Sequence, residues 1–252
     1  MLKLENDIYV AAIPRSGGTL VANVLKIIFN KNSIEHWHRL SLYNKKDYLI
    51  VVNRDIRDCV ISSYRVRKKF DDIDNIIKCN VFQIYPYIVN YSKAINGFDD
   101  YLKQHYGNIN CLKLKYENFY NNFDNLFNEI EKFFKITIDL NTKNIIKEKL
   151  SIQKQKISQK NILDFRKTNK LGLYGHHIFT GKIGTWKVIL KTKYHRIYNY
   201  LTLNTNLKIG YKNNPISRPT LLSYLICKLF YLIFVLDTYA HKIRRKIYVK
   251  HI

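Results

Sequence analysis

The chain has 252 residues, enough for one domain of moderate to large size with a sizeable core. Its hydrophobic content of 46% is typical of a globular protein and excludes a disordered chain. Lys and Arg number 43 against 19 Asp and Glu, a formal net charge of +24. The partner is therefore expected to be anionic: a nucleotide, a polyanionic acceptor, a nucleic acid or a membrane surface.

The cysteines are scattered, with no C-x-x-C pair and no metal-like cluster with histidines, which predicts reduced, mostly structural thiols and no metal site. The cysteines are Cys59, Cys79, Cys111 and Cys227.

The first seven residues precede an apolar run that is too short for a secretory signal, so a cytoplasmic protein is expected.

The first informative stretch runs from Ile8 to Phe29. Its apolar start, Ile8 to Ile13, is too brief for a helix and breaks at Pro14 into the turn Pro-Arg-Ser-Gly-Gly-Thr, which predicts a buried strand entering a tight loop. Apolar residues then recur at helical spacing, and Thr19 is placed to cap the first turn. They are Leu20, Val21, Val24, Leu25 and Ile28.

This loop has the features of an anion site. A helix start offers unpaired backbone N–H groups, Gly17 and Gly18 allow close approach to the main chain, and Arg15 adds a positive charge. It is not the usual nucleotide-triphosphate loop, because no G-x-x-x-x-G-K-[ST] pattern is present. The alternative is a strand–helix connection whose glycines serve only the turn.

The second informative stretch begins with an apolar strand from Tyr48 to Val52 and ends in Asn-Arg-Asp-Ile-Arg-Asp, after which a helical pattern starts at Asp58. Arg54 then lies at the strand's carboxyl end, the usual ligand edge of an open α/β sheet. Ser62 lies about two helical turns further on, facing the same edge. A guanidinium and a hydroxyl converging there suit a phosphate monoester. The alternative is a surface Arg–Asp network beside a solvated basic helix.

Taken together, the two stretches resemble the sulfotransferases that use 3′-phosphoadenosine 5′-phosphosulfate (PAPS). In that family the first loop holds the 5′-phosphosulfate, and an Arg and a Ser after a later strand hold the 3′-phosphate. The resemblance implies that Arg54 and Ser62 bind the 3′-phosphate. It also implies that the first loop binds the phosphosulfate through Arg15, Ser16, Gly17, Gly18 and Thr19.

Two later segments extend the resemblance to about residues 5 to 212. A strand-like run from Cys111 to Lys115 precedes Tyr-Glu-Asn, similar to the family's Tyr-Glu-Asp, which implies that Tyr116 lies near the adenine. The segment Gly-Lys-Ile-Gly-Thr-Trp-Lys looks like the family's loop that closes over the cofactor. The cofactor-binding residues implied there are Lys182, Gly184 and Trp186.

The catalytic base is expected between the two phosphate motifs. His36-Trp37-His38 resembles in spacing the Lys-Thr-His of the family's cytosolic members, which puts the base at His38. His36 shares a strand face with His38 and is a second candidate. Glu35 is a third, because other branches of the family use a Glu.

These features predict a single P-loop-like α/β domain over residues 1–214, with a central, mostly parallel sheet flanked by helices. The expected reaction moves a sulfuryl group from PAPS to a hydroxyl or amine of a glycan, a lipid-linked glycan or a small molecule, without a metal and without a nucleic-acid partner. Two rival functions are a non-enzymatic binder of RNA or another polyanion and a nucleoside-type kinase. The missing loop Lys–Ser/Thr pair and magnesium-binding pattern count against the kinase.

Residues 215–252 form a tail of different character. The segment Leu221 to Leu236 is apolar on almost every side, and His241 to Lys246 is basic. Its sixteen apolar residues fall short of the roughly 20 that span a bilayer. One interpretation is a helix lying at an anionic membrane surface, peripheral to the bilayer. The other is packing onto the catalytic domain or onto a second copy of the chain.

Overall fold

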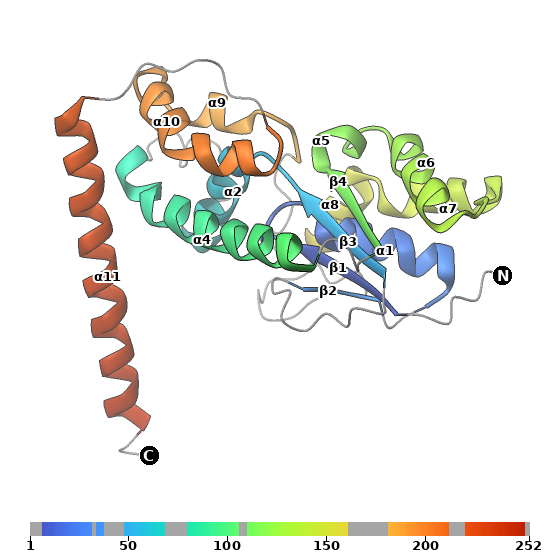
Figure 1. The fold of residues 1–252 in the computed structure, drawn as a ribbon, viewed down its shortest axis with the longest axis horizontal. Helices are drawn as coiled ribbons and strands as arrows, with labels where there is room; N and C mark the ends of the chain where they lie inside the picture. The colour runs from blue at the N-terminus through green and yellow to red at the C-terminus, as the bar shows by residue number, and fades with distance from the viewer. Residues whose placement is uncertain are drawn as a thin grey trace.

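The computed structural model describes residues 7–31, 34–37, 48–68, 80–105, 110–160, 181–211 and 220–249 (Figure 1). The strands are β1 Ile8–Ala12, β2 Glu35–Trp37, β3 Tyr48–Asn53 and β4 Asn110–Lys115. The helices are α1 Gly18–Phe29, α2 Ile56–Lys68, α4 Val81–His105, α5 Tyr116–Phe119, α6 Phe123–Phe134, α7 Leu140–Leu150, α8 Ile152–Lys160, α9 Thr185–Ile189, α10 Thr192–Lys208 and α11 Leu221–Val249.

The four strands form one parallel sheet in the order β2-β1-β3-β4. The chain passes from β1 to β2, which lies on one side of β1. It then crosses back to form β3, which pairs with the other side of β1. The direction of winding therefore reverses between β1 and β3, and ligands of such sheets bind outside the carboxyl ends of the strands at this reversal. The two predicted phosphate motifs leave the sheet from these two strands. The predicted α/β fold with a parallel sheet flanked by helices is confirmed.

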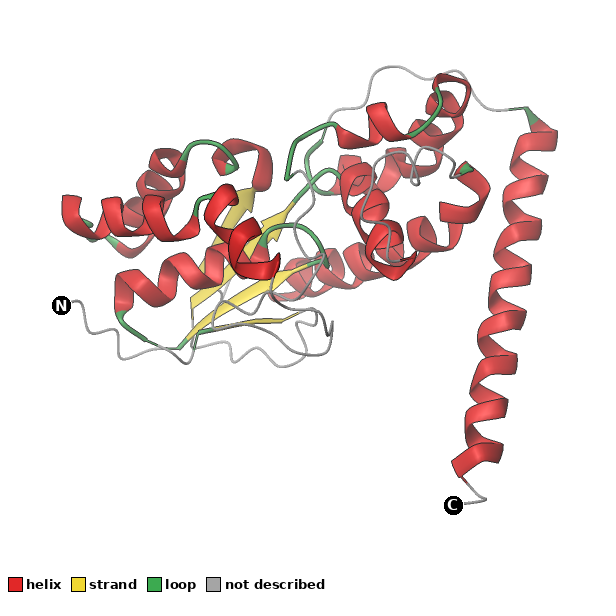
Figure 2. Cartoon of the chain, turned by 180° about the vertical axis from the view of Figure 1, so that it is seen from behind, coloured by secondary structure: helices red, strands yellow, loops and turns green. Residues whose placement is uncertain are grey.

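Helices cover both faces of the sheet (Figures 1 and 2). Val10 and Ala12 of β1 belong to one buried cluster with α1, α6 and α7, whereas Ala11, between them in sequence, packs with Leu102 of α4. Because both faces are buried, the central strands β1 and β3 are apolar at almost every position, whereas β4 at the edge alternates. This explains the short continuous apolar runs in the sequence.

A further buried cluster lies beside the carboxyl edge of the sheet and joins α2, α4, α9 and α10. Val60 and Tyr64 of α2 pack there with Trp186 of α9 and Tyr198 of α10. Helix α2 lies more than a hundred residues before α9 and α10 in the sequence. Their common core fixes α9 and the loop before it against the start of α2.

Two local predictions were wrong. Thr19 does not cap α1, because the N-cap is Gly17 in a left-handed conformation (φ 95°) with no side-chain cap hydrogen bond. A glycine takes this conformation without the steric cost that a Cβ would bring. The second helix begins at Ile56 and not at Asp58.

The tail forms the single long helix α11, which stands at one side of the molecule in both views (Figures 1 and 2). Within the described ranges, no helix combines the length and the apolarity needed to cross a bilayer.

Candidate active site

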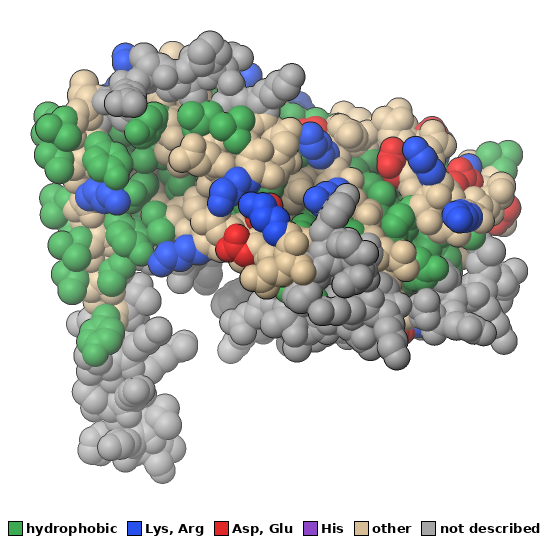
Figure 3. Space-filling view, in the orientation of Figure 1, with side chains coloured by type: hydrophobic (Ala, Val, Ile, Leu, Met, Phe, Trp, Pro, Cys, Tyr) green, Lys and Arg blue, Asp and Glu red, His purple; other side chains and the backbone are tan. Residues whose placement is uncertain are grey.

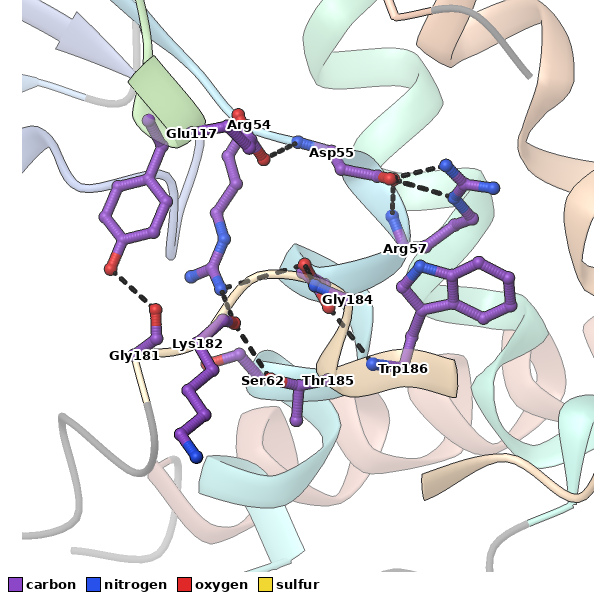
Figure 4. A network of polar contacts seen from close by, with 12 residues as sticks. Arg54, Asp55, Arg57, Ser62, Glu117, Gly181, Lys182, Gly184, Thr185 and Trp186 are labelled. Carbon is purple, nitrogen blue, oxygen red and sulfur yellow. Dashed lines mark hydrogen bonds and ion pairs between the residues drawn. The ribbon is translucent and has the colours of Figure 1, made fainter. Parts of the chain in front are cut away.

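Arg54 follows β3 directly, and its side chain joins three segments (Figure 4). Its Nη1 donates to the backbone carbonyl of Arg15, at 3.2 Å, and its Nη2 donates to that of Lys182, at 3.0 Å. The guanidinium is almost completely buried. Burial alone would lower its pKa, but the negative potential of neighbouring groups, Asp58 among them, outweighs burial and raises it. A permanently charged group thus lies where two loops meet. They are the first loop, residues 14–19, and the closing loop, residues 181–187.

Arg15 brings Ser62 to the same point. Its backbone is left-handed (φ 70°), which is uncommon for a residue with a side chain. Its Nε donates to the Ser62 hydroxyl at 3.0 Å. The structure therefore gathers Arg15, Arg54 and Ser62 at the sheet edge that the sequence predicted.

The rest of the first loop is shaped by packing. The Ser16 hydroxyl is buried and donates to the carbonyl of Ile13 at 2.8 Å, so it holds the turn. A Cβ on Gly17 would lie 2.6 Å from Cδ2 of Tyr116. Gly17 therefore makes room for Tyr116. Gly18 is the first residue of α1 and Thr19 the second, at a helix start that no side chain caps among the described residues.

Tyr116 lies between the two loops. The Arg54 guanidinium carbon is 4.3 Å from the centre of its ring, and its hydroxyl donates to the carbonyl of Gly181 at 2.9 Å. Burial raises the pKa of Tyr116 to about 12, although Arg54 lowers it, so the phenol stays a hydrogen-bond donor at neutral pH. The ring is 7% exposed. In this arrangement one face of the ring supports the Arg54 guanidinium.

Asp58 holds the closing loop, a role that the sequence interpretation did not assign. Its carboxylate accepts from the backbone N–H of Gly184 at 2.8 Å and of Trp186 at 3.1 Å, and lies 3.9 Å from Arg54. Burial raises the Asp58 pKa, whereas Arg54 and the two N–H groups oppose that shift. Its spacing of four residues from Arg54 was the only signal in the sequence.

The closing loop contributes mainly backbone and packing. The Lys182 carbonyl accepts from Arg54, while its exposed side chain points away from that guanidinium (Figure 4). Gly184 is left-handed (φ 73°) and is the N-cap of α9. Trp186 is buried, and the Arg57 guanidinium carbon lies 4.5 Å from its ring centre.

An outer layer of polar side chains fixes the turn between β3 and α2. Glu117 accepts from the backbone N–H of Asp55 at 3.1 Å and from the Tyr211 hydroxyl. Asn206 donates to Asp55 and accepts from the N–H of Ile56, both at 3.0 Å. The Arg–Asp network considered from the sequence exists as the pairs Arg57–Asp55 and Arg54–Asp58, but these side chains are largely buried and not on the surface. Asn206 and Tyr211 had no local signal, since Asn206 lies 150 residues from Ile56 and Tyr211 lies 94 residues from Glu117.

The candidate bases are located only in part. Glu35 and His36 belong to β2, the edge strand, and pair in register with Tyr9 and Val10 of β1. Their side chains and the whole of His38 lie outside the described residues. The choice of base therefore stays a prediction. Across the described ranges, no group of three or more His, Cys, Asp and Glu residues is placed to hold a metal.

A parallel α/β sheet whose two polar loops meet at its reversal point is the architecture of a P-loop-like enzyme. The sulfotransferase domain model matches residues 36–205, two thirds of the chain. The chain therefore belongs to the sulfotransferase family and is an enzyme of that class.

The fold agrees with this family. A crystal structure of a mouse sulfotransferase complexed with PAP matches with a TM-score of 0.55 and 16% identity, covering 82% of this chain and 87% of that one. No curated protein sequence matches the chain. The first loop precedes the residues that the family model matches, so its role is inferred from its place in the fold.

Proposed function

We propose that this sulfotransferase moves a sulfuryl group from PAPS to a hydroxyl or amine of a glycan or lipid-linked glycan. The family gives the reaction class, and the similar mouse enzyme was crystallised with PAP. One observation carries the proposal: the Arg54 guanidinium bonds to both the Arg15 turn and the closing loop at Lys182. Both loops thus lie within reach of one ligand that carries two separate anionic groups, as PAPS does with its 3′-phosphate and its 5′-phosphosulfate.

The residues present fit such a donor. Arg54 and Ser62 would hold the 3′-phosphate, and Arg15 with the start of α1 would hold the phosphosulfate. Arg54 Nε is buried and has no hydrogen-bond partner among the described residues. A buried, charged donor without a partner is costly, and a phosphate oxygen would satisfy it.

The proposed chemistry is direct in-line transfer to the acceptor. Negative charge grows on the leaving oxygen, and Arg15 and the backbone N–H groups at the start of α1 would stabilise it. His38 would take the proton from the acceptor hydroxyl or amine, since an unperturbed imidazole titrates at about pH 6.5. His36 and Glu35 are the other candidates for this role.

The acceptor class is supported by charge and by the tail. A net charge of +24 favours an anionic glycan, and the apolar tail favours a lipid-linked one. Incubation of extracts from the source organism with labelled PAPS would identify the sulfated product.

Donor choice is tested by thermal unfolding of the full chain with adenosine 3′,5′-bisphosphate, ATP or RNA. Only a ligand that binds the native state preferentially raises the melting temperature, by an amount that grows with its concentration. We expect the bisphosphate to raise it most. A larger shift with ATP would favour the kinase alternative, and a larger shift with RNA would favour the polyanion binder.

The two arginines should separate binding from chemistry. Arg15→Ala should lower kcat by about 100-fold or more, because a transition-state donor is lost. Arg54→Ala should mainly weaken bisphosphate binding, by roughly tenfold or more, because a charged hydrogen bond is lost. Lys154→Ala, at an exposed position on α8, is the matched control. The assignment is wrong if both arginine variants bind and turn over like the parent.

A further inference from the structure

Helix α11 contacts the rest of the described protein through one face of its first half. Phe230 stacks on Phe82 of α4 with ring centroids 5.6 Å apart, and Tyr231 meets Tyr85 edge-on at 6.1 Å. Cys227, one turn earlier, is completely buried. The second half of the helix runs past the body of the molecule in both ribbon views (Figures 1 and 2). The docked face is thus occupied by α4.

The opposite face carries a row of leucines that make no comparable contacts with the described residues. They recur at intervals of three and four residues, which places them on one side of a helix, and each is more than half exposed. Green side chains lie along the outer edge of the upper part of α11 in the space-filling view (Figure 3). This apolar stripe consists of Leu222, Leu225, Leu229, Leu232 and Leu236.

Positive charge accompanies the stripe. Lys228 interrupts the apolar segment, and the helix continues to Val249 through the basic sequence His-Lys-Ile-Arg-Arg-Lys. Asp237 is the only acidic residue in the sequence of α11. Helices that lie in a membrane interface have an apolar face that enters the headgroup and acyl boundary and basic residues that attract anionic lipid.

We infer that α11 lies in the interface of an anionic lipid bilayer, with the apolar stripe toward the acyl chains. The charge distribution favours lipid over a second copy of the chain. Pairing two stripes side by side would bring together two chains of charge +24, whereas anionic headgroups neutralise that charge. The inference does not depend on which donor or acceptor the site uses.

Membrane binding of the full-length protein is tested by sedimentation with two kinds of vesicle. One contains phosphatidylcholine alone, and the other contains phosphatidylcholine with anionic phosphatidylglycerol. We expect binding at least about tenfold tighter to the anionic vesicles, because several Lys and Arg residues each add electrostatic attraction. Raising the salt concentration should weaken this binding, because exposed charges are screened.

Two variants and one control locate the binding surface. The stripe variant makes three leucines polar, and the basic variant neutralises three basic residues. Each should bind anionic vesicles about tenfold or more weakly than the parent, since the first loses apolar burial and the second loses electrostatic attraction. The charge-matched control should bind like the parent, and circular dichroism with thermal unfolding checks that all three fold. The stripe variant is Leu225→Ser with Leu229→Ser and Leu232→Ser. The basic variant is Arg244→Gln with Arg245→Gln and Lys246→Gln. The control is Lys132→Gln with Lys149→Gln and Lys154→Gln.

Three results would overturn the inference. The first is that the parent binds neither kind of vesicle. The second is that the folded stripe variant binds as tightly as the parent. The third is that the parent is a dimer by light scattering and binds no vesicles, whereas the stripe variant is a monomer. A second copy of the chain would then cover the stripe. Bisphosphate binding by the stripe variant should equal that of the parent, so failure here is distinct from failure of the proposed function.

Discussion

The sheet edge and helix α11 are held in place by different means. At the edge, buried charges bind backbone groups from distant segments, as Arg54 does with the first loop and Asp58 with the closing loop. Helix α11 is held by aromatic contacts on one face and leaves its other face exposed. A buried charge tolerates little displacement from its partners, whereas nonpolar contacts are less directional. The edge should therefore resist local motion more strongly than α11.

The largest effect is expected from Asp58→Ala. This change removes the acceptor of two backbone N–H groups and leaves Arg54 without its nearby carboxylate. Breaking such buried interactions should lower the free energy of unfolding by about 3 kcal/mol. Urea denaturation followed by circular dichroism measures the change.

The matched control is Asp99→Ala, which breaks an exposed ion pair with Lys103 at 2.8 Å on α4. Exposed pairs contribute little, so a change below about 1 kcal/mol is expected. Equal losses in the two variants would mean that Asp58 is not a key link to the closing loop.

A smaller loss is expected from Gly17→Ala. The new Cβ would lie 2.6 Å from Tyr116, and the left-handed backbone disfavours alanine, so we expect a loss of about 2 kcal/mol. Gly97→Ala is the control, because its Cβ would meet nothing within 4 Å inside α4. There alanine should stabilise the helix by up to about 1 kcal/mol. Unchanged stability of Gly17→Ala would show that the loop yields easily.

The smallest perturbation probes α11 itself, through thiol labelling of single-cysteine variants that retain Cys227 or Cys59. Both thiols are completely buried, but Cys227 lies on the docked face of α11 and Cys59 lies in the core beside the site. Cys227 should react with a disulfide reagent faster, because undocking one helix costs less than unfolding the domain. Equal rates would mean that α11 opens only with the whole protein.

The pH dependence of this labelling follows from the thiol. Burial raises the Cys227 pKa to about 11. Only the thiolate reacts, so a reaction in the docked state should accelerate about tenfold per pH unit up to that value. A rate that instead levels off near the ordinary thiol pKa of about 8.5 would show that Cys227 reacts after α11 undocks.

The sequence predicted the parts of the site that depend on short-range pattern. A short apolar run that ends in a polar turn indicates a strand and the loop that follows it, so the positions of Arg15 and Arg54 were predictable. Ser62 followed from helical spacing. The parallel sheet then brings all three together, as the structure shows.

The sequence did not predict the contacts that span the chain. Asp58 meets Gly184 across 126 residues, and no local pattern encodes such a pair. The fit of Tyr116 against Gly17 depends on tertiary packing, so the sequence did not reveal that this glycine also makes room for the Tyr116 ring. Thr19 was assigned a capping role from residue preference alone, and the backbone of Gly17 overrides that preference.

The position of Trp186 provides an intrinsic reporter. The chain has two tryptophans, and this one lies at the end of the loop that Asp58 and Arg54 hold, with the Arg57 guanidinium 4.5 Å from its ring centre. A nearby cation alters indole emission, so movement of the loop should change the fluorescence of the unlabelled enzyme. With Trp37 replaced by Phe, stopped-flow emission would follow nucleotide arrival in real time.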